Sequence, residues 1–152
     1  MSALVSDALS KGATAVAGTG TVEAPGTLVA PVVLTDVTPD MDIWSAEIFG
    51  PVVVVHVADN ADDAIALANE SPCGLTAGVI TSDWAAGLSI ARRLRAGAVH
   101  VNNQDTADQA EAPFGGIRDS GYGRFGGQAG IDAFTDTRWI TLGAEGRPAF
   151  PI

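Results

Sequence analysis

An apolar run at residues 52–57 follows Gly50 and Pro51, and it constrains the fold more than any other stretch of the chain. Four consecutive valines without polar alternation predict a strand that is buried on both faces. Such strands occur almost only in parallel sheets that helices cover on both sides. The run therefore predicts an α/β fold.

Two helix-and-strand repeats follow this run. Asn60 is a candidate N-cap, because Asp62 and Asp63 would occupy the first helical turn, where acidic side chains complement the helix dipole. Ser82 is the candidate cap of the next helix, and three arginines near its end suit the dipole there. The order strand, helix, strand, helix, strand predicts one parallel sheet with crossover helices. Over the whole chain we expect helices at 2–11, 61–69, 83–96 and 130–134, and strands at 13–16, 28–34, 52–57, 77–81, 98–102 and 138–142.

Charge and composition limit the possible partners. The formal net charge of −10 over 152 residues argues against nucleic acid and against anionic membrane surfaces. No apolar run approaches the ~18 residues of a membrane-spanning helix. The N-terminus shows no signal-peptide pattern and Cys73 is the only cysteine, which together predict a cytoplasmic protein.

Two short patterns are weak as signs of chemistry. The glycines from Gly121 to Gly126 match G-x-G-x-x-G, but a loop precedes them and no strand–helix–strand unit follows, so we reject a dinucleotide-binding fingerprint. Cys73 could form a catalytic pair with His56 or His100 only if the fold brings them close in space. A lone cysteine is more often a buried apolar side chain. One cysteine and two histidines without ligand spacing predict no metal site.

Glu47 and Phe49 precede the valine run and allow two interpretations. Residues two apart share a face in an extended chain, so this carboxylate and phenyl ring would suit a flat ring with hydroxyl groups nearby. The alternative is a core phenylalanine beside a solvated glutamate. The two residues by themselves favour the alternative.

A glycine-rich segment, residues 113–127, carries the most specific pattern in the chain. Its sequence, Pro-Phe-Gly-Gly-Ile-Arg-Asp-Ser-Gly-Tyr-Gly-Arg-Phe-Gly-Gly, resembles the C-terminal signature of the aldehyde dehydrogenase superfamily. Residues 47–51, Glu-Ile-Phe-Gly-Pro, resemble a second motif of that family. The stretches 120–127 and 134–141 are similar to those of salicylaldehyde, vanillin and benzaldehyde dehydrogenases, although Arg118 replaces the usual lysine.

The resemblance implies an NAD- or NADP-dependent oxidation of an aldehyde, aromatic in the most similar group, to the carboxylic acid. It implies that Glu47 holds the hydroxyls of the nicotinamide ribose and that Phe49 packs near the nicotinamide ring, while Phe114 lines the substrate pocket. It also implies that residues 1–137 are the C-terminal part of the catalytic domain and that residues 138–152 form an oligomerisation strand and tail.

The resemblance covers roughly the last third of such an enzyme. The family's NAD-binding domain, nucleophilic cysteine and general-base glutamate belong upstream, so no catalytic residue is assigned here and Cys73 does not inherit the nucleophile's role. We expect the chain to be inactive alone and to bind NAD or NADP weakly. The implied partner is a second copy of the chain or the missing N-terminal part of the enzyme. The alternative is a non-catalytic remnant that serves as an assembly or interaction module.

Overall fold

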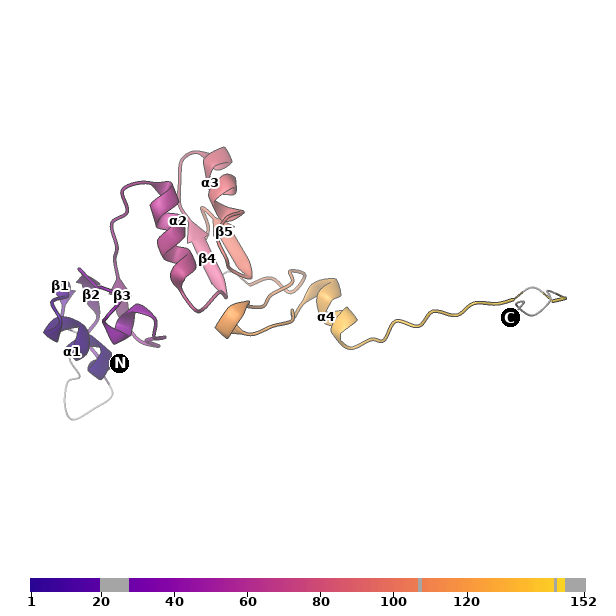
Figure 1. Cartoon of the computed structure of the whole chain (residues 1–152), viewed down its shortest axis with the longest axis horizontal. Helices are drawn as coiled ribbons and strands as arrows, with labels where there is room; N and C mark the ends of the chain where they lie inside the picture. Colours follow the sequence, from indigo (N-terminus) through magenta and orange to yellow (C-terminus); the bar gives the residue numbers. More distant parts are fainter. Residues whose placement is uncertain (20–27, 107, 144, 147–152) are drawn as a thin grey trace.

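The chain has an elongated shape in three parts, which follow one another along the sequence (Figure 1). Helix α1 and strands β1 to β3 form the first part, and α2 to β5 form the central part. The glycine-rich segment leads from there to α4 and to a C-terminal stretch that runs away from the other elements (Figure 1). The computed structural model describes residues 1–19, 28–106, 108–143 and 145–146.

The first part contains the main apolar core. Its elements are α1 (Ser2–Ser10), β1 (Thr14–Gly18), β2 (Val32–Thr35), the 3₁₀ turn η1 (Asp42–Trp44) and β3 (Val52–Val54). Strand β2 pairs antiparallel with β1 and parallel with β3, and it begins only after Pro31, which has no N–H to donate to a ladder. The buried side chains that pack together in this core are Val5, Ala8, Ala13, Val32, Leu34, Val37, Met41 and Ile43.

The valine run is less buried than its sequence predicts. Strand β3 ends at Val54, and the side chains of Val53 and Val57 are 55% and 93% exposed. The expectation of a long strand buried on both faces is wrong in this chain. Strand β3 is at the edge of a three-stranded sheet, and β2 is the one strand that pairs with it among the described residues.

The central part confirms the parallel α/β arrangement. Its elements are α2 (Ala61–Glu70), β4 (Thr76–Val79), α3 (Trp84–Ala91) and β5 (Ala98–Val101), and β4 pairs parallel with β5 across the α3 crossover. However, β3 and β4 belong to different sheets, so the expectation of one continuous sheet is wrong. Periodicity predicts where strands lie, but not which strand edges meet, because pairing depends on tertiary contacts.

Local capping is confirmed at α2 and differs at α3. The Asn60 Oδ1 atom accepts hydrogen bonds from the backbone N–H groups of Asp62 and Asp63, at 2.9 and 3.0 Å. At α3 the cap is Asp83 and not Ser82, because the Asp83 carboxylate accepts two backbone N–H groups of the first turn. Helix α3 also ends at Ala91, and its last turn contains no arginine. The expectation that three arginines occupy the end of this helix is therefore wrong.

The C-terminal stretch forms a helix but no strand. Helix α4 covers Gly127–Ala133, and residues 138–142 have no strand pairing. A strand needs a hydrogen-bonded neighbour, and none of the described residues supplies one to this stretch. The oligomerisation strand and the boundary between residues 137 and 138 therefore remain predictions. No helix in the described ranges has the length and apolar character needed to cross a bilayer.

Candidate functional site

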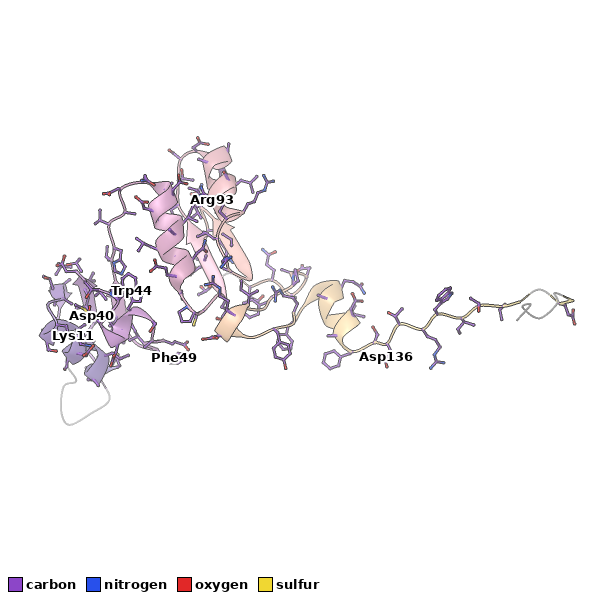
Figure 2. The ribbon with its side chains drawn as sticks, in the orientation of Figure 1. Lys11, Asp40, Trp44, Phe49, Arg93 and Asp136 are labelled. Atoms are coloured by element: carbon purple, nitrogen blue, oxygen red, sulfur yellow. The ribbon has the colours of Figure 1, made fainter. Side chains whose placement is uncertain are left out.

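The segment that carries Glu47 and Phe49 projects from the first part. Met41 and Ile43 are buried on its N-terminal side and Ile48 packs against the same core, so the segment is anchored from within. Glu47 is exposed, and the Phe49 side chain is 93% exposed and points away from the core (Figure 2). Both side chains are therefore open to a partner molecule.

Phe49 has an unusual backbone conformation. Its φ angle of +48° lies in the left-handed region, which is rare for a bulky residue. The chain from Glu47 to Phe49 is thus not an extended strand, and the argument that the two residues share a strand face is wrong. The alternative of a core phenylalanine is also wrong, because the ring is exposed. Strained conformations of this kind are often found at functional sites.

Glu47 lines a hollow of about 470 Å³ between η1 and the start of β4. The side chains of Cys73, Arg95 and Ser120 line the same hollow, whereas Phe49 does not. Glu47 forms no hydrogen bond or ion pair with the described residues. Its carboxylate can therefore accept two hydroxyl groups from outside the chain, and the open Phe49 ring can pack on a flat ring.

The glycine-rich segment is hydrogen-bonded to the connection between α2 and β4. The Ile117 N–H donates to the Gly74 carbonyl at 3.0 Å, and the Gly74 N–H donates to the Ser120 hydroxyl at 3.0 Å. The Asp119 N–H donates to the Pro72 carbonyl at 3.1 Å. These bonds place the 3₁₀ turn η2 (Arg118–Ser120) beside the hollow that Glu47 lines.

Arg118 is attached to the C-terminal end of α2. Its Nη1 atom donates to the Asn69 carbonyl at 2.9 Å and to the Ser71 carbonyl. Carbonyls at a helix C-terminus have no intrahelical partner, so a guanidinium group there satisfies them and complements the helix dipole. Arg118 therefore has a structural role in this chain.

Two asparagines join neighbouring elements of the central part. The side chain of Asn69 donates to the Arg93 carbonyl at 2.9 Å and accepts the Arg95 N–H at 2.7 Å. The side chain of Asn102, directly after β5, accepts the backbone N–H of Thr81, two residues beyond β4, at 2.8 Å. The contacts of Asn69 join the C-terminal end of α2 to the chain just beyond α3.

Phe114 lies in a second, separate hollow. It forms an antiparallel bridge with Phe125, with N–H to carbonyl distances of 2.8 and 2.7 Å. Its partly buried side chain lines a cavity of about 250 Å³ together with His100 and Asp105. This isolated bridge was missed in the sequence, because a single pair of residues has no periodicity.

The structure therefore does not gather the three predicted site residues at one place. Glu47 lines one hollow, Phe114 lines another, and Phe49 stands in the open. Gly121 to Gly126 follow a 3₁₀ turn and not a buried strand, which confirms the rejection of the dinucleotide fingerprint. Cys73 is exposed, so the interpretation of this cysteine as a buried apolar side chain is wrong. Among the described residues, no group of three His, Cys, Asp or Glu side chains is placed to hold a metal ion.

Solved structures of similar chains share this fold. A salicylaldehyde dehydrogenase from Pseudomonas putida, crystallised with salicylaldehyde, is 36% identical with a TM-score of 0.90, and the match covers 97% of this chain and 30% of that one. An aldehyde dehydrogenase from Mycobacterium tuberculosis, complexed with NAD+, is 35% identical with a TM-score of 0.85, again over 97% and 30%.

Sequence comparison shows the same relationship. A vanillin dehydrogenase from a Pseudomonas species is 40% identical over 98% of this chain and 30% of its own length. The NADP(+)-dependent succinate-semialdehyde dehydrogenase of Deinococcus radiodurans is 45% identical over 92% of this chain and 29% of its own. The chain thus spans about 30% of the length of these relatives. A family model described as "Aldehyde dehydrogenase family" matches residues 1–140, and the chain belongs to that family.

Proposed function

We propose that this chain supplies part of an enzyme that oxidises an aromatic aldehyde to the carboxylic acid with NAD+ or NADP+. The observation that carries the proposal is the family match over residues 1–140. The aromatic substrate is supported by similarity to a vanillin dehydrogenase and to a salicylaldehyde dehydrogenase. One relative of higher identity acts on succinate semialdehyde by its name, so similarity by itself does not decide the substrate.

In this proposal the chain contributes binding groups and no catalytic residue. The Glu47 carboxylate accepts the ribose hydroxyls, the Phe49 ring packs near the nicotinamide, and Phe114 forms a wall of the substrate pocket. The exposed, unpartnered state of the first two supports their roles. NAD(P)+, when bound, accepts a hydride from the substrate. Because one open carboxylate and one open ring give few contacts, the 152 residues alone bind the cofactor weakly and do not oxidise aldehydes.

The exposed apolar side chains support a partner polypeptide. Val57, Trp139 and Leu142 are 93%, 89% and 92% exposed, and one edge of β3 has no strand partner in the part of the chain that the structure describes. Such surfaces drive association. We propose that a second copy of the chain, or the N-terminal part of a family enzyme, covers them.

Calorimetry and a dehydrogenase assay test this proposal. We expect no heat of binding when NAD+ is added to the chain alone, and no NADH from NAD+ with vanillin or benzaldehyde. In a mixture with a polypeptide that carries the N-terminal two thirds of a family enzyme, we expect NADH formation that depends on the aldehyde. In that mixture Glu47→Gln should raise the KM for NAD+ by about tenfold, which is the loss of one charged hydrogen bond. Glu70→Gln, an exposed change on α2, is the matched control.

The alternative function, a non-catalytic assembly module, predicts a different result. It predicts a stable homo-oligomer that shows no dehydrogenase activity in any mixture. Tight NAD+ binding by the chain alone would contradict the division of roles given above.

A further inference from the structure

Two charged side chains join helix α1 to the 3₁₀ turn η1. Asp7 lies in the last turn of α1 and Lys11 directly follows the helix, so this spacing of four residues places both on one face. The Asp7 Oδ2 atom accepts the backbone N–H of Asp42 at 2.9 Å, and the Lys11 Nζ atom donates to the Asp40 carbonyl at 2.7 Å. Figure 2 shows Lys11 and Asp40 side by side.

These bonds satisfy backbone groups at the start of η1. Asp42 is the first residue of the turn, and the first N–H groups of a helical turn have no partner within it. Hydrogen bonds with one charged partner are roughly twice as strong as neutral ones. Asp7 and Lys11 also form an ion pair at 2.8 Å, which holds each side chain in place for its bond to the backbone. The bonds from Lys11 and then from Asp42 lower the pKa of Asp7, so this carboxylate is ionised at neutral pH.

The hydrogen bonds of η1 continue as far as the residue before Glu47. The Trp44 N–H donates to the Met41 carbonyl at 3.0 Å, and the Ala46 N–H donates to the Asp42 carbonyl at 3.2 Å. Because Ala46 directly precedes Glu47, the position of Asp42 determines where the Glu47 side chain leaves the backbone.

The other end of α1 lies against the far end of the same segment. A Cβ atom at Gly50 would overlap the Met1 Sδ atom, so the Met1 side chain packs on the residue directly after Phe49. Helix α1 thus contacts the chain before and after Glu47. The Glu47 side chain itself has no hydrogen-bonding partner among the described residues, so the backbone beneath it decides where its carboxylate lies.

We propose that Asp7 and Lys11 are positioning residues for the cofactor, because they fix η1 against α1 and thereby place the Glu47 carboxylate for the ribose hydroxyls. The inference rests on the proposed function and extends it to side chains that do not touch the cofactor. Neither residue is among those that line the hollow of about 470 Å³ beside Glu47. They therefore act through the backbone of η1 and not by direct contact.

Steady-state kinetics of the mixed enzyme, this chain with the N-terminal two thirds of a family enzyme, test the inference. Asp7→Ala should raise the KM for NAD+ about threefold with kcat and the KM for vanillin unchanged, which is less than for Glu47→Gln because the carboxylate is misplaced rather than lost. Asp7→Asn keeps an oxygen that accepts the Asp42 N–H, so it should restore most of the affinity. Ser10→Ala, which removes a hydrogen bond within α1 and none to η1, is the matched control.

A double variant separates positioning from a general loss of stability. In a Glu47→Ala chain no carboxylate remains to be placed, so adding Asp7→Ala should have no further effect on the KM for NAD+. A further rise of about threefold in that chain would make the two losses independent and would overturn the inference. Lys11→Met keeps the aliphatic stem and loses the donor, and it should show the same dependence on Glu47.

Hydrogen exchange of the 152-residue chain alone reports on the turn directly. Asp7→Ala should speed exchange of the amide hydrogens of Asp42 and Ala46 and leave those of β2 unchanged. Equal exchange at Asp42 in the variant and the unchanged chain would show that Asp7 does not fix η1, and the inference would be wrong.

The kinetic results distinguish this inference from the proposed function. If the mixture forms NADH from vanillin but Asp7→Ala leaves the KM for NAD+ unchanged, the positioning role fails and the proposed function stands. If no mixture that contains the unchanged chain oxidises any aldehyde, the proposed function fails and the positioning role fails with it.

Discussion

The first and central parts of the molecule are held together in different ways. The eight-residue apolar cluster that includes Val5 and Leu34 lies entirely in the first part. In the described central part, only Ile65 and Val79 are buried apolar side chains of the core. Hydrophobic burial therefore stabilises the first part to a much greater extent.

The central part relies on hydrogen bonds to backbone and on glycines instead. Asn69, Arg118 and Ser120 each bond to the backbone of another segment. Gly97 and Gly115 touch backbone to backbone, because a Cβ atom at Gly97 would overlap the Gly115 carbonyl. The glycine-rich segment 113–127 therefore has an architectural role in this chain. Its glycines let the backbones of two segments come into contact where little apolar surface is buried.

Truncation in the apolar core should have the largest effect. Leu34 is fully buried, so Leu34→Ala removes packing on all sides and should lower the free energy of unfolding by about 3 kcal/mol. Denaturant unfolding followed by circular dichroism measures this change. Val53→Ala is the control, because its side chain is 55% exposed in the same sheet and should lose well under half as much. Equal losses would remove the basis of the comparison.

A side chain at the glycine contact should have the next largest effect. Gly97→Ala places a methyl group against the Gly115 carbonyl and should destabilise the central part by about 2 kcal/mol through overpacking. Hydrogen exchange should show the loss in β4 and β5 and not in β2. At Gly143 an added Cβ atom meets nothing within 4 Å, so Gly143→Ala is the matched control. Exchange that rises equally in β2 would mean that the two parts unfold as one.

Removal of the guanidinium group from the end of α2 should have a smaller effect. Arg118→Met leaves the Asn69 and Ser71 carbonyls to water and should cost about 1 kcal/mol in thermal unfolding. Arg118→Lys keeps the charge but has no planar guanidinium group, so its loss of stability should lie between that of the methionine variant and zero. A lysine variant as unstable as the methionine variant would show that charge at this helix end contributes nothing.

The ion pair of the first part should have the smallest effect, and it should depend on pH. Asp7 lies 2.8 Å from the Lys11 Nζ atom and accepts the Asp42 N–H at 2.9 Å. The hydrogen bond from Lys11 and then the one from Asp42 lower the pKa of Asp7, and the bond to Asp7 raises the pKa of Lys11. Lys11 is exposed and Asp7 is partly exposed, so water screens the ion pair and its stabilising effect is modest.

These two pKa shifts make the stability that the ion pair contributes depend on pH in opposite directions. The contribution of Asp7 to the free energy of unfolding is complete above the pKa of about 4 that it has in the unfolded chain. This contribution is lost as the pH falls through its lower pKa in the folded chain. The contribution of Lys11 is complete below about pH 10 and is lost as the pH rises through its higher folded pKa. The melting temperature of Asp7→Asn should thus lie slightly below that of the unchanged chain at pH 7, and the two should converge near pH 2. A difference that persists at pH 2 would assign the effect to packing rather than charge.

Local features were predicted well from the sequence, and contacts between distant segments were not. The Asn60 cap depends on atoms within three residues and was confirmed. The Asp83 cap was missed by one residue, because serine and aspartate are both good caps and only the final backbone geometry selects between them. Of the predicted site residues, Phe49 was misplaced in conformation, because a left-handed φ angle leaves no periodic pattern in the sequence.

The sequence by itself determined the family, the parallel α/β character and the order of helices and strands, since motifs and periodicity are properties of contiguous residues. Only the tertiary structure decided that the valine run is a half-exposed edge strand, and that Glu47 and Phe114 line different cavities. The reason is physical: the burial of a side chain depends on the elements that pack on it. An apolar sequence predicts that a surface will be covered, but it does not say which segment, or which other polypeptide, will cover it.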